Sequence, residues 1–215
     1  KLLKYVMKLM LMKKRFFVIL IITLLLGTFG FSQKIGGTLQ IGIETEPIGF
    51  DPHLVTAFSS FRILENIYDG LLKYDENMNL VPNIAEKYEI PDPYTIIFTI
   101  RDNVYFHNGD KLILDDIIFS FERIRDKEVG SPAATYYAEV ESISIIESNK
   151  IQFKLKVPMV NSLLPNFASV NSSIVSKKYV KDGHNLRLET NGTGPFYLSQ
   201  YMSGDHITLE KNNKY

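Results

Sequence analysis

Few residues of this chain stand at the spacings that catalysis or metal binding requires. No two of the four histidines lie at a metal-ligand interval, and no Gly-x-Ser-x-Gly motif occurs. The loop from Gly192 to Gly194 lacks the spacing of a phosphate-binding loop. The absence of cysteine excludes disulfides, thiolate metal sites and cysteine nucleophiles. The residues therefore predict no catalytic set, no metal site and no cofactor, and His107, in a predicted hairpin turn, is interpreted as structural.

Two carboxylates are candidates for acid–base chemistry. Glu44 and Glu46 follow a predicted strand, which is a position where a glycoside hydrolase could carry a catalytic acid. No motif places a second acid opposite them, so a solvent-exposed loop is the simpler interpretation. A secreted hydrolase stays as the alternative from another functional class.

The overall charge balance hides a basic N-terminal segment. The chain has 215 residues, of which 24 are basic and 24 are acidic. Residues 1–32 contain six of the basic residues and no acidic residue, which leaves 18 basic against 24 acidic and a net charge of −6. A mildly acidic body argues against nucleic acid as a partner. Its length is sufficient for one large hydrophobic core or two small ones.

Residues 1–32 are predicted to be a signal peptide. Lys13-Lys14-Arg15 precede an apolar run, residues 16–26, whose length is typical of a signal peptide and short for a membrane span. Gly30 and Ser32 are small residues that suit cleavage after Ser32. The segment predicts export, and an uncleaved N-terminal anchor is the alternative.

The stretch from Tyr94 to Arg125 is the clearest folding unit. Alternating apolar residues predict a strand over 94–101, and Asn108-Gly109 predicts a hairpin turn with positive φ angles. Asp115-Asp116 supplies the negative charge that favours a helix N-terminus. The helix should then bury a stripe made of Ile117, Ile118, Phe121 and Ile124.

Similar patterns predict the other elements. Alternation indicates strands over 38–43, 72–74, 88–90, 140–146, 151–157, 174–175 and 206–210. Helices or helical turns are expected over 61–68, 84–86, 131–137, 163–167 and 177–180, the first of them capped by Ser59 or Ser60. The loop 191–195 is expected to be a tight bend where the backbone passes close to another segment.

A series of short motifs runs through residues 35–215 in a fixed order. They are Gly36-Gly37-Thr38-Leu39, Asp51-Pro52-His53, Glu65 to Leu71, Leu80-Val81-Pro82, Phe98 to Arg101, Val104 to Gly109, Asp116 to Ser120, Ser131-Pro132, Gly192 to Phe196 and Leu209 to Asn212. In wording and spacing this series resembles the extracellular solute-binding proteins of family 5. These are the peptide-, dipeptide- and nickel-binding components of ABC importers.

The resemblance implies a mixed α/β (α+β) fold that forms an incomplete lobe of the periplasmic-binding-protein type II class. Residues 35–68 would begin the sheet subdomain of the first lobe, and 190–215 would return to it. Residues 69–189 would form an inserted antiparallel-sheet subdomain. Members of the family close two lobes on a ligand, so this chain would be the N-terminal part of such a protein. An inert fragment is the corresponding alternative.

The resemblance also implies a function. The protein would bind oligopeptides or a similar small solute in the periplasm or cell envelope, without catalysis, and deliver them to a cognate ABC permease. An oligosaccharide or a metal chelate is the alternative ligand. Ligand contacts would come from Thr56, Ala57 and Phe58, and from Ala133, where peptide-binding members commonly carry Tyr. The family's capping Thr is replaced by Ile113, which predicts a weaker cap for the following helix.

Overall fold

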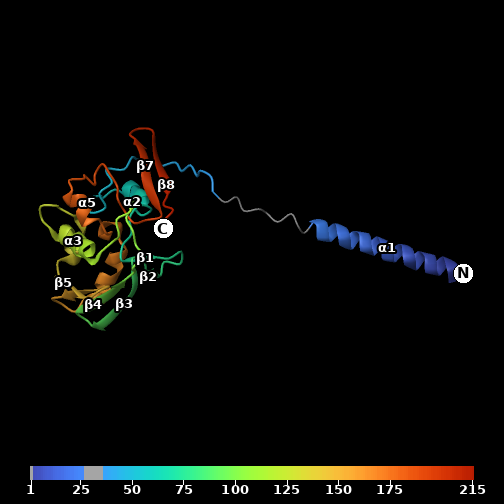
Figure 1. Cartoon of the computed structure of the whole chain (residues 1–215), viewed down its shortest axis with the longest axis horizontal. Helices are drawn as coiled ribbons and strands as arrows, with labels where there is room; N and C mark the ends of the chain where they lie inside the picture. Colours follow the sequence, from blue (N-terminus) through green and yellow to red (C-terminus); the bar gives the residue numbers. More distant parts are fainter. Residues whose placement is uncertain (1, 27–35) are drawn as a thin grey trace. The chain divides into compact units, whose positions relative to one another are not determined.

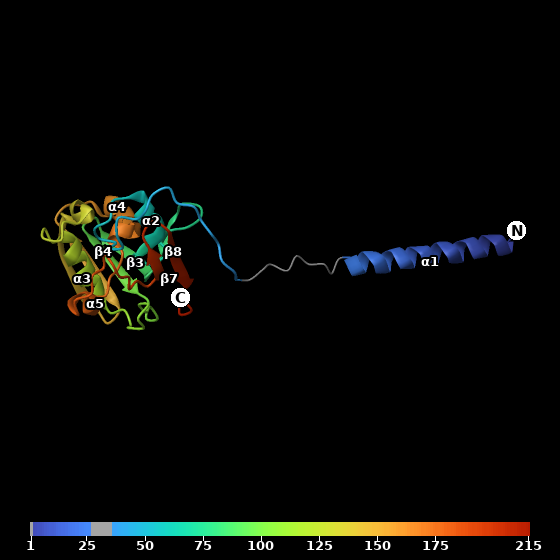
Figure 2. The same cartoon turned by 90° about the horizontal axis from the view of Figure 1, so that it is seen from above.

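The structure, a computed structural model, describes residues 2–26 and 36–215 (Figures 1 and 2). They fall into two units, residues 1–42 and residues 43–215. The first unit contains helix α1 (Leu2–Leu26), which covers most of the predicted signal peptide. The predicted cleavage site at Gly30–Ser32 lies outside the described residues. In the part of the chain that is described, no helix combines the length and apolar character needed to cross a membrane.

The strand predicted over 38–43 is wrong. This stretch is extended but belongs to no hydrogen-bonded strand among the described residues, and Leu39 and Ile41 are 83% and 71% exposed. Alternating apolar residues make a strand only where a neighbouring strand binds the backbone and another layer covers the apolar face. The structure supplies neither for this stretch.

The second unit contains three antiparallel sheets in residues 43–215. The largest has the order β3-β4-β6-β5, built from β3 (Ala85–Asp92), β4 (Thr95–Ile100), β5 (Val140–Glu147) and β6 (Lys150–Leu155). A small sheet pairs β1 (Leu72–Tyr74) with β2 (Leu80–Pro82), and a hairpin pairs β7 (Phe196–Met202) with β8 (His206–Lys211). Figure 1 shows the β7–β8 hairpin and the four-stranded sheet at opposite ends of this unit.

Short helices complete the second unit. The α-helices are α2 (Phe58–Leu64), α3 (Leu114–Arg125), α4 (Val160–Leu163) and α5 (Lys177–Lys181). The 3-10 helices are η1 (Pro132–Tyr137), η2 (Leu164–Ala168) and η3 (Val170–Ser172).

Two hydrophobic clusters fill this unit. The first lies between α3 and the four-stranded sheet, where the ring of Phe121 packs edge-on against Phe153 with 4.9 Å between ring centroids. Phe98 of β4 contacts Phe167 of η2 at the same centroid distance. The second cluster is formed by residues that precede and follow the first cluster in the sequence. Its buried members are Phe50, Val55, Ile63, Leu64, Ile67, Tyr68, Val175 and Leu186.

The central predictions are confirmed. Strand β4 and helix α3 form where expected. Of the predicted stripe, Ile117, Phe121 and Ile124 are fully buried, and Ile118 is partly buried. Helix α3 has no side-chain cap at Ile113, as predicted, and Asp116 Oδ2 instead accepts from the Ile113 N–H at 3.0 Å. Strands β5 and β6 form the predicted hairpin with alternating burial along β6.

Several local predictions are corrected. Ala85 and Glu86 begin strand β3 instead of a helical turn, because Ala85 pairs with Ile100 and its N–H bonds Leu71 O. Ile174 and Val175 form no strand, because their N–H groups bind Asp69 O and the Ser120 hydroxyl.

Two turn and cap predictions are also corrected. Ala57 occupies the N-cap of α2, because Ser60 accepts from the Ile48 N–H and Ser59 donates to Glu46 O. In the predicted turn only Gly109 has a positive φ, of 91°.

The loop 191–195 is the tight bend that the sequence predicts. A Cβ at Gly192 would overlap Ile67 O, and one at Gly194 would lie 2.7 Å from Asn66 O. On its other side the loop contacts His107, whose backbone N–H donates to Gly192 O at 2.8 Å. The Gly192 N–H donates to His107 Nδ1 at 3.2 Å, and Nε2 lies 3.1 Å from Gly194 O. His107 is thus a structural residue, and burial lowers its pKa.

We expect Gly192→Ala to destabilise the protein by about 3 kcal/mol or more, because the new methyl group meets backbone atoms that cannot move aside. Gly42→Ala is the control, since nothing lies within 4 Å of a Cβ at Gly42. Urea unfolding followed by circular dichroism measures both, as the chain has no Trp. Equal unfolding midpoints for the two variants would show that the bend is not tight.

Candidate ligand-binding site

The segment Asp51-Pro52-His53 leads into the loop predicted to contact a ligand. Asp51 and His53 are polar yet almost fully buried. The Asp51 side chain accepts from the His53 N–H at 3.0 Å, and Asp51 O accepts from the N–H groups of Leu54 and Val55. These local bonds fold the segment into a turn that projects the following residues outward.

A charged residue from α3 completes this turn. Arg123 Nη2 lies 2.5 Å from Asp51 Oδ2, and Nη1 lies 3.1 Å from Oδ1, which makes a bidentate ion pair. Arg123 Nη1 also donates to His53 Nδ1 at 2.8 Å, so His53 Nε2–H donates to Ser173 O at 2.8 Å. His53 is therefore held as the neutral Nε2–H tautomer. Burial first, and then the charge of Arg123, lower the pKa of His53 to about 4.

Asn171 fixes the same loop from a third segment. Its side-chain amide donates to Pro52 O at 2.7 Å and to Val55 O at 3.0 Å. The loop is therefore tied to α3 and to the region of η3, both far away in the sequence. A shallow hollow of about 130 Å³ lies beside it, lined in part by Ile48, Leu54 and Val55.

The structure places the predicted contact residues in two different environments. Thr56 is exposed, Ala57 is partly buried, and Phe58 is 68% exposed with the Arg62 guanidinium 4.7 Å from its ring centroid. Ala133 is fully buried in η1, where its N–H donates to the Ser131 hydroxyl. Thr56 and Phe58 are thus exposed on either side of the partly buried Ala57, whereas the Ala133 methyl group belongs to the hydrophobic core.

Residues near Ala133 offer the exposed groups that Ala133 lacks. Tyr136 is 45% exposed, while Tyr137 is buried and donates to the Ser172 hydroxyl at 2.8 Å. The sequence analysis did not identify Arg123 and Asn171 as the residues that hold the loop. The position of Arg123 in helix α3, close to the buried apolar stripe, could have indicated a buried ion pair. The sequence around Asn171 gives no comparable indication.

Glu46, the candidate for a hydrolase, serves as an anchor. Its carboxylate accepts from the Tyr201 hydroxyl at 2.9 Å, the Ser203 hydroxyl at 3.3 Å and the Gly204 N–H at 2.8 Å. These bonds lower the pKa of Glu46, chiefly through Gly204. A carboxylate held in the ionised form suits tethering of the β7–β8 turn and does not suit a general acid.

We expect Arg123→Met to destabilise the protein by about 3–5 kcal/mol, because it leaves Asp51 buried without a counter-charge. The matched control is Lys87→Met, which removes a mostly exposed ion pair to Glu89 and should cost less than about 1 kcal/mol. Urea unfolding gives both values. A loss below about 1 kcal/mol for Arg123→Met would contradict the role assigned to the ion pair.

The buried neutral His53 makes stability depend on pH. Between the ordinary pKa of about 6.5 and the folded value of about 4, the unfolded chain binds a proton that the folded protein does not. The free energy of unfolding should therefore fall by about 3 kcal/mol as the pH falls through this window.

The raised pKa values of Asp69 and Asp116 act in the opposite direction, so the difference from His53→Gln isolates the histidine. Urea titrations of both proteins from pH 7 to 4 measure it. Parallel pH profiles for the two proteins would exclude His53 as the source.

Comparison with known proteins supplies the family. The sequence profile of the bacterial extracellular solute-binding proteins, family 5 (middle region), matches residues 79–215. The dipeptide-binding protein DppE of Bacillus subtilis (strain 168) is 28% identical over 200 residues, which cover 82% of this chain and 36% of that protein.

Solved structures show a similar fold. The Escherichia coli murein tripeptide binding protein MppA matches with a TM-score of 0.75 at 20% identity, over 80% of this chain and 38% of that chain. AgaA from A. tumefaciens R10, in complex with agropinic acid, matches with a TM-score of 0.74 at 26% identity, over 79% of this chain and 35% of that chain.

The chain therefore spans little more than a third of the length of these relatives. Its mixed α/β fold with antiparallel sheets matches part of their structures. Because the profile match covers more than half of the sequence, the chain belongs to the bacterial extracellular solute-binding proteins of family 5, a family of binding proteins and not of enzymes.

Proposed function

We propose that this chain is part of the substrate-binding component of an ABC importer and binds oligopeptides or a similar small solute outside the cytoplasmic membrane. The family match supports this proposal. The loop 51–58 is the feature of the structure that supports the proposal most directly, because it identifies residues that could contact a ligand. Buried polar bonds hold its base, while Thr56 and Phe58 are left exposed at its end. A rigid base with an exposed aromatic side chain is a suitable platform for a ligand.

We further propose that residues 35–215 form an incomplete lobe of the type II class. Residues 35–68 and 190–215 would belong to the sheet subdomain, and 69–189 to the inserted subdomain. The two hydrophobic clusters support this division, since one contains residues from 71 to 174 and six of the eight buried members of the other lie between residues 50 and 68. Leu198, Ile207 and Leu209 pack against that second cluster. A second lobe would close over the ligand and supply the remaining contacts.

The relatives suggest the class of ligand. DppE is a dipeptide-binding protein and MppA a murein tripeptide binding protein, which favours a peptide. AgaA is solved with agropinic acid, so a ligand other than a peptide is the alternative within the family, as is a metal chelate or an oligosaccharide. The proposed partner is a cognate membrane permease. The proposed location is the periplasm or cell envelope, and residues 1–32 are proposed to be the signal peptide that directs export.

Amide shifts in NMR spectra of the ¹⁵N-labelled chain, titrated with di- and tripeptides, test the proposal. We expect weak, saturable binding that shifts residues 56–58 and the neighbourhood of Tyr136. Phe58→Ala should weaken binding about fivefold, since an exposed aromatic contact contributes about 1 kcal/mol. Tyr94→Ala is the control, because Tyr94 is an exposed aromatic residue in the β3–β4 turn.

The other outcomes separate the alternatives. Shifts produced only by an oligosaccharide or a nickel–histidine chelate would favour those ligands over peptides. Cleavage of the added peptide or sugar, abolished in Glu46→Gln, would favour the hydrolase. Peptide shifts that leave residues 56–58 unchanged would exclude this loop as the site, and no shift with any ligand would favour the inert fragment.

A further inference from the structure

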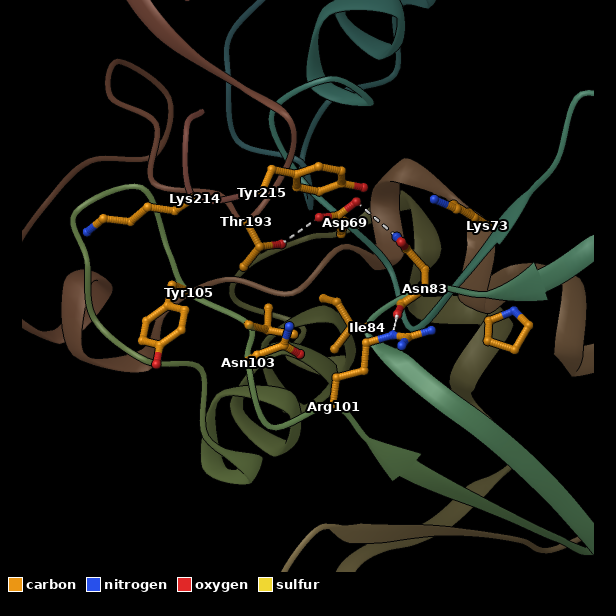
Figure 3. A pocket seen from close by; sticks show the side chains of 12 residues that line it. Asp69, Lys73, Asn83, Ile84, Arg101, Asn103, Tyr105, Thr193, Lys214 and Tyr215 are labelled. Atoms are coloured by element: carbon orange, nitrogen blue, oxygen red, sulfur yellow. Dashed lines mark hydrogen bonds between the residues drawn. The ribbon is translucent and has the colours of Figure 1, made fainter. Parts of the chain in front are cut away.

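A polar cavity of about 270 Å³ lies away from the loop 51–58 (Figure 3). Its lining comes from five stretches of the chain and includes none of the predicted contact residues: Asp69 and Lys73, Pro82 to Ile84, Arg101 with Asn103 to Tyr105, Thr193, and Lys214 with Tyr215. This volume lies slightly below the range of pockets for drug-sized molecules, so the cavity suits a smaller ligand.

The floor of the cavity holds a buried carboxylate. Asp69 is 9% exposed, and its two oxygens accept from Asn83 Nδ2 at 2.9 Å and from the Thr193 hydroxyl at 3.0 Å. Both donors are neutral, and no ion pair to Asp69 is seen within residues 36–215. Because both of its oxygens accept hydrogen bonds, Asp69 is held as a carboxylate acceptor even though burial raises its pKa. A ligand cation would stabilise the charge of this buried carboxylate.

A guanidinium lies on the other side of Asn83. Arg101 Nε donates to Asn83 O at 2.8 Å, which fixes the direction of the side chain. This is its one side-chain hydrogen bond in the described part of the chain, so both Nη groups are available to an acceptor. Figure 3 shows Asn83 between Asp69 and Arg101, bonded to both, so that one residue sets the positions of the two opposite charges.

The set of charges selects the ligand class. Lys73, Arg101 and Lys214 line the cavity together with the single acid Asp69. A simple anion would meet the buried carboxylate, and a simple cation would meet three positive side chains. A molecule with an ammonium and a carboxylate a few atoms apart matches both, because a guanidinium fork binds a carboxylate through two parallel hydrogen bonds.

We propose that this cavity binds a free amino acid, with its ammonium group at Asp69 and its carboxylate at Arg101, assisted by Lys73. The site is independent of the loop 51–58 and of the ligand proposed for it. It gives the chain a second binding function, for a ligand about as large as one residue of a peptide.

L-alanine titrated into the ¹⁵N-labelled chain tests the proposal. We expect saturable shifts at the amides of Asn83 and Thr193. Propionate, which lacks the ammonium, and ethylamine, which lacks the carboxylate, should each bind at least tenfold more weakly.

Asp69→Asn and Arg101→Gln should each weaken alanine binding at least tenfold. Lys111→Gln is the matched control, since the Lys111 side chain is an exposed cation paired with Asp102 and does not line the cavity.

Each contrary outcome overturns the proposal. Propionate binding as tightly as alanine would make the cavity a simple anion site. Alanine shifts confined to residues 56–58 would assign the binding to the other loop, and no saturable shift would leave the cavity as solvent space. If Asp69→Asn does not fold, the exposed Arg101→Gln decides, because its unchanged affinity alone refutes the assignment.

Discussion

The buried ion pair between Asp51 and Arg123 is the interaction on which the second unit most depends. Two charges removed from water are tolerated only when their hydrogen-bonding groups are satisfied. Here His53 Nδ1 accepts a further guanidinium N–H, and the Nε2–H of the same ring donates to Ser173 O. The turn before α2, helix α3 and the segment after η3 are therefore fixed to one another by polar geometry, in a region where apolar packing alone would not set their register.

The loop 191–195 makes a second set of contacts between distant segments of this unit, and these contacts involve its backbone. The loop 191–195 passes between Ile67 O and the ring of His107, and only glycine fits where it approaches the carbonyls. The β7–β8 hairpin that follows is anchored at its far end by Glu46. A two-stranded hairpin is marginal by itself, so these contacts supply the support that a larger sheet would otherwise give.

The polar residues in these positions hold structure together and do no chemistry on a substrate. His53 and His107 are both neutral acceptors of N–H groups, and Glu46 is an ionised acceptor. A binding protein needs this arrangement, because affinity depends on a surface whose shape does not change when the ligand arrives. Such groups resemble catalytic candidates in a sequence, and only their partners reveal their use.

Local patterns determined much of the second unit. The alternation in β4 and β6 and the stripe of Ile117, Phe121 and Ile124 predicted these elements, because burial of one face imposes a period that is visible in a short window. The glycines of the loop 191–195 likewise predicted a close backbone approach. The wording of the motifs, which local physics does not explain, predicted the family that the sequence profile shows.

The tertiary structure decided whatever depends on a distant partner. Residues 38–43 have the alternation of a strand but no ladder among the described residues, whereas Ala85 joins a strand because Ile100 and Leu71 bind its backbone. Arg123 meets Asp51 across 72 positions, and the cavity around Asp69 combines segments from both ends of the unit. Hydrogen-bonding and charge partners so far apart leave no local period, so only the folded chain identifies them.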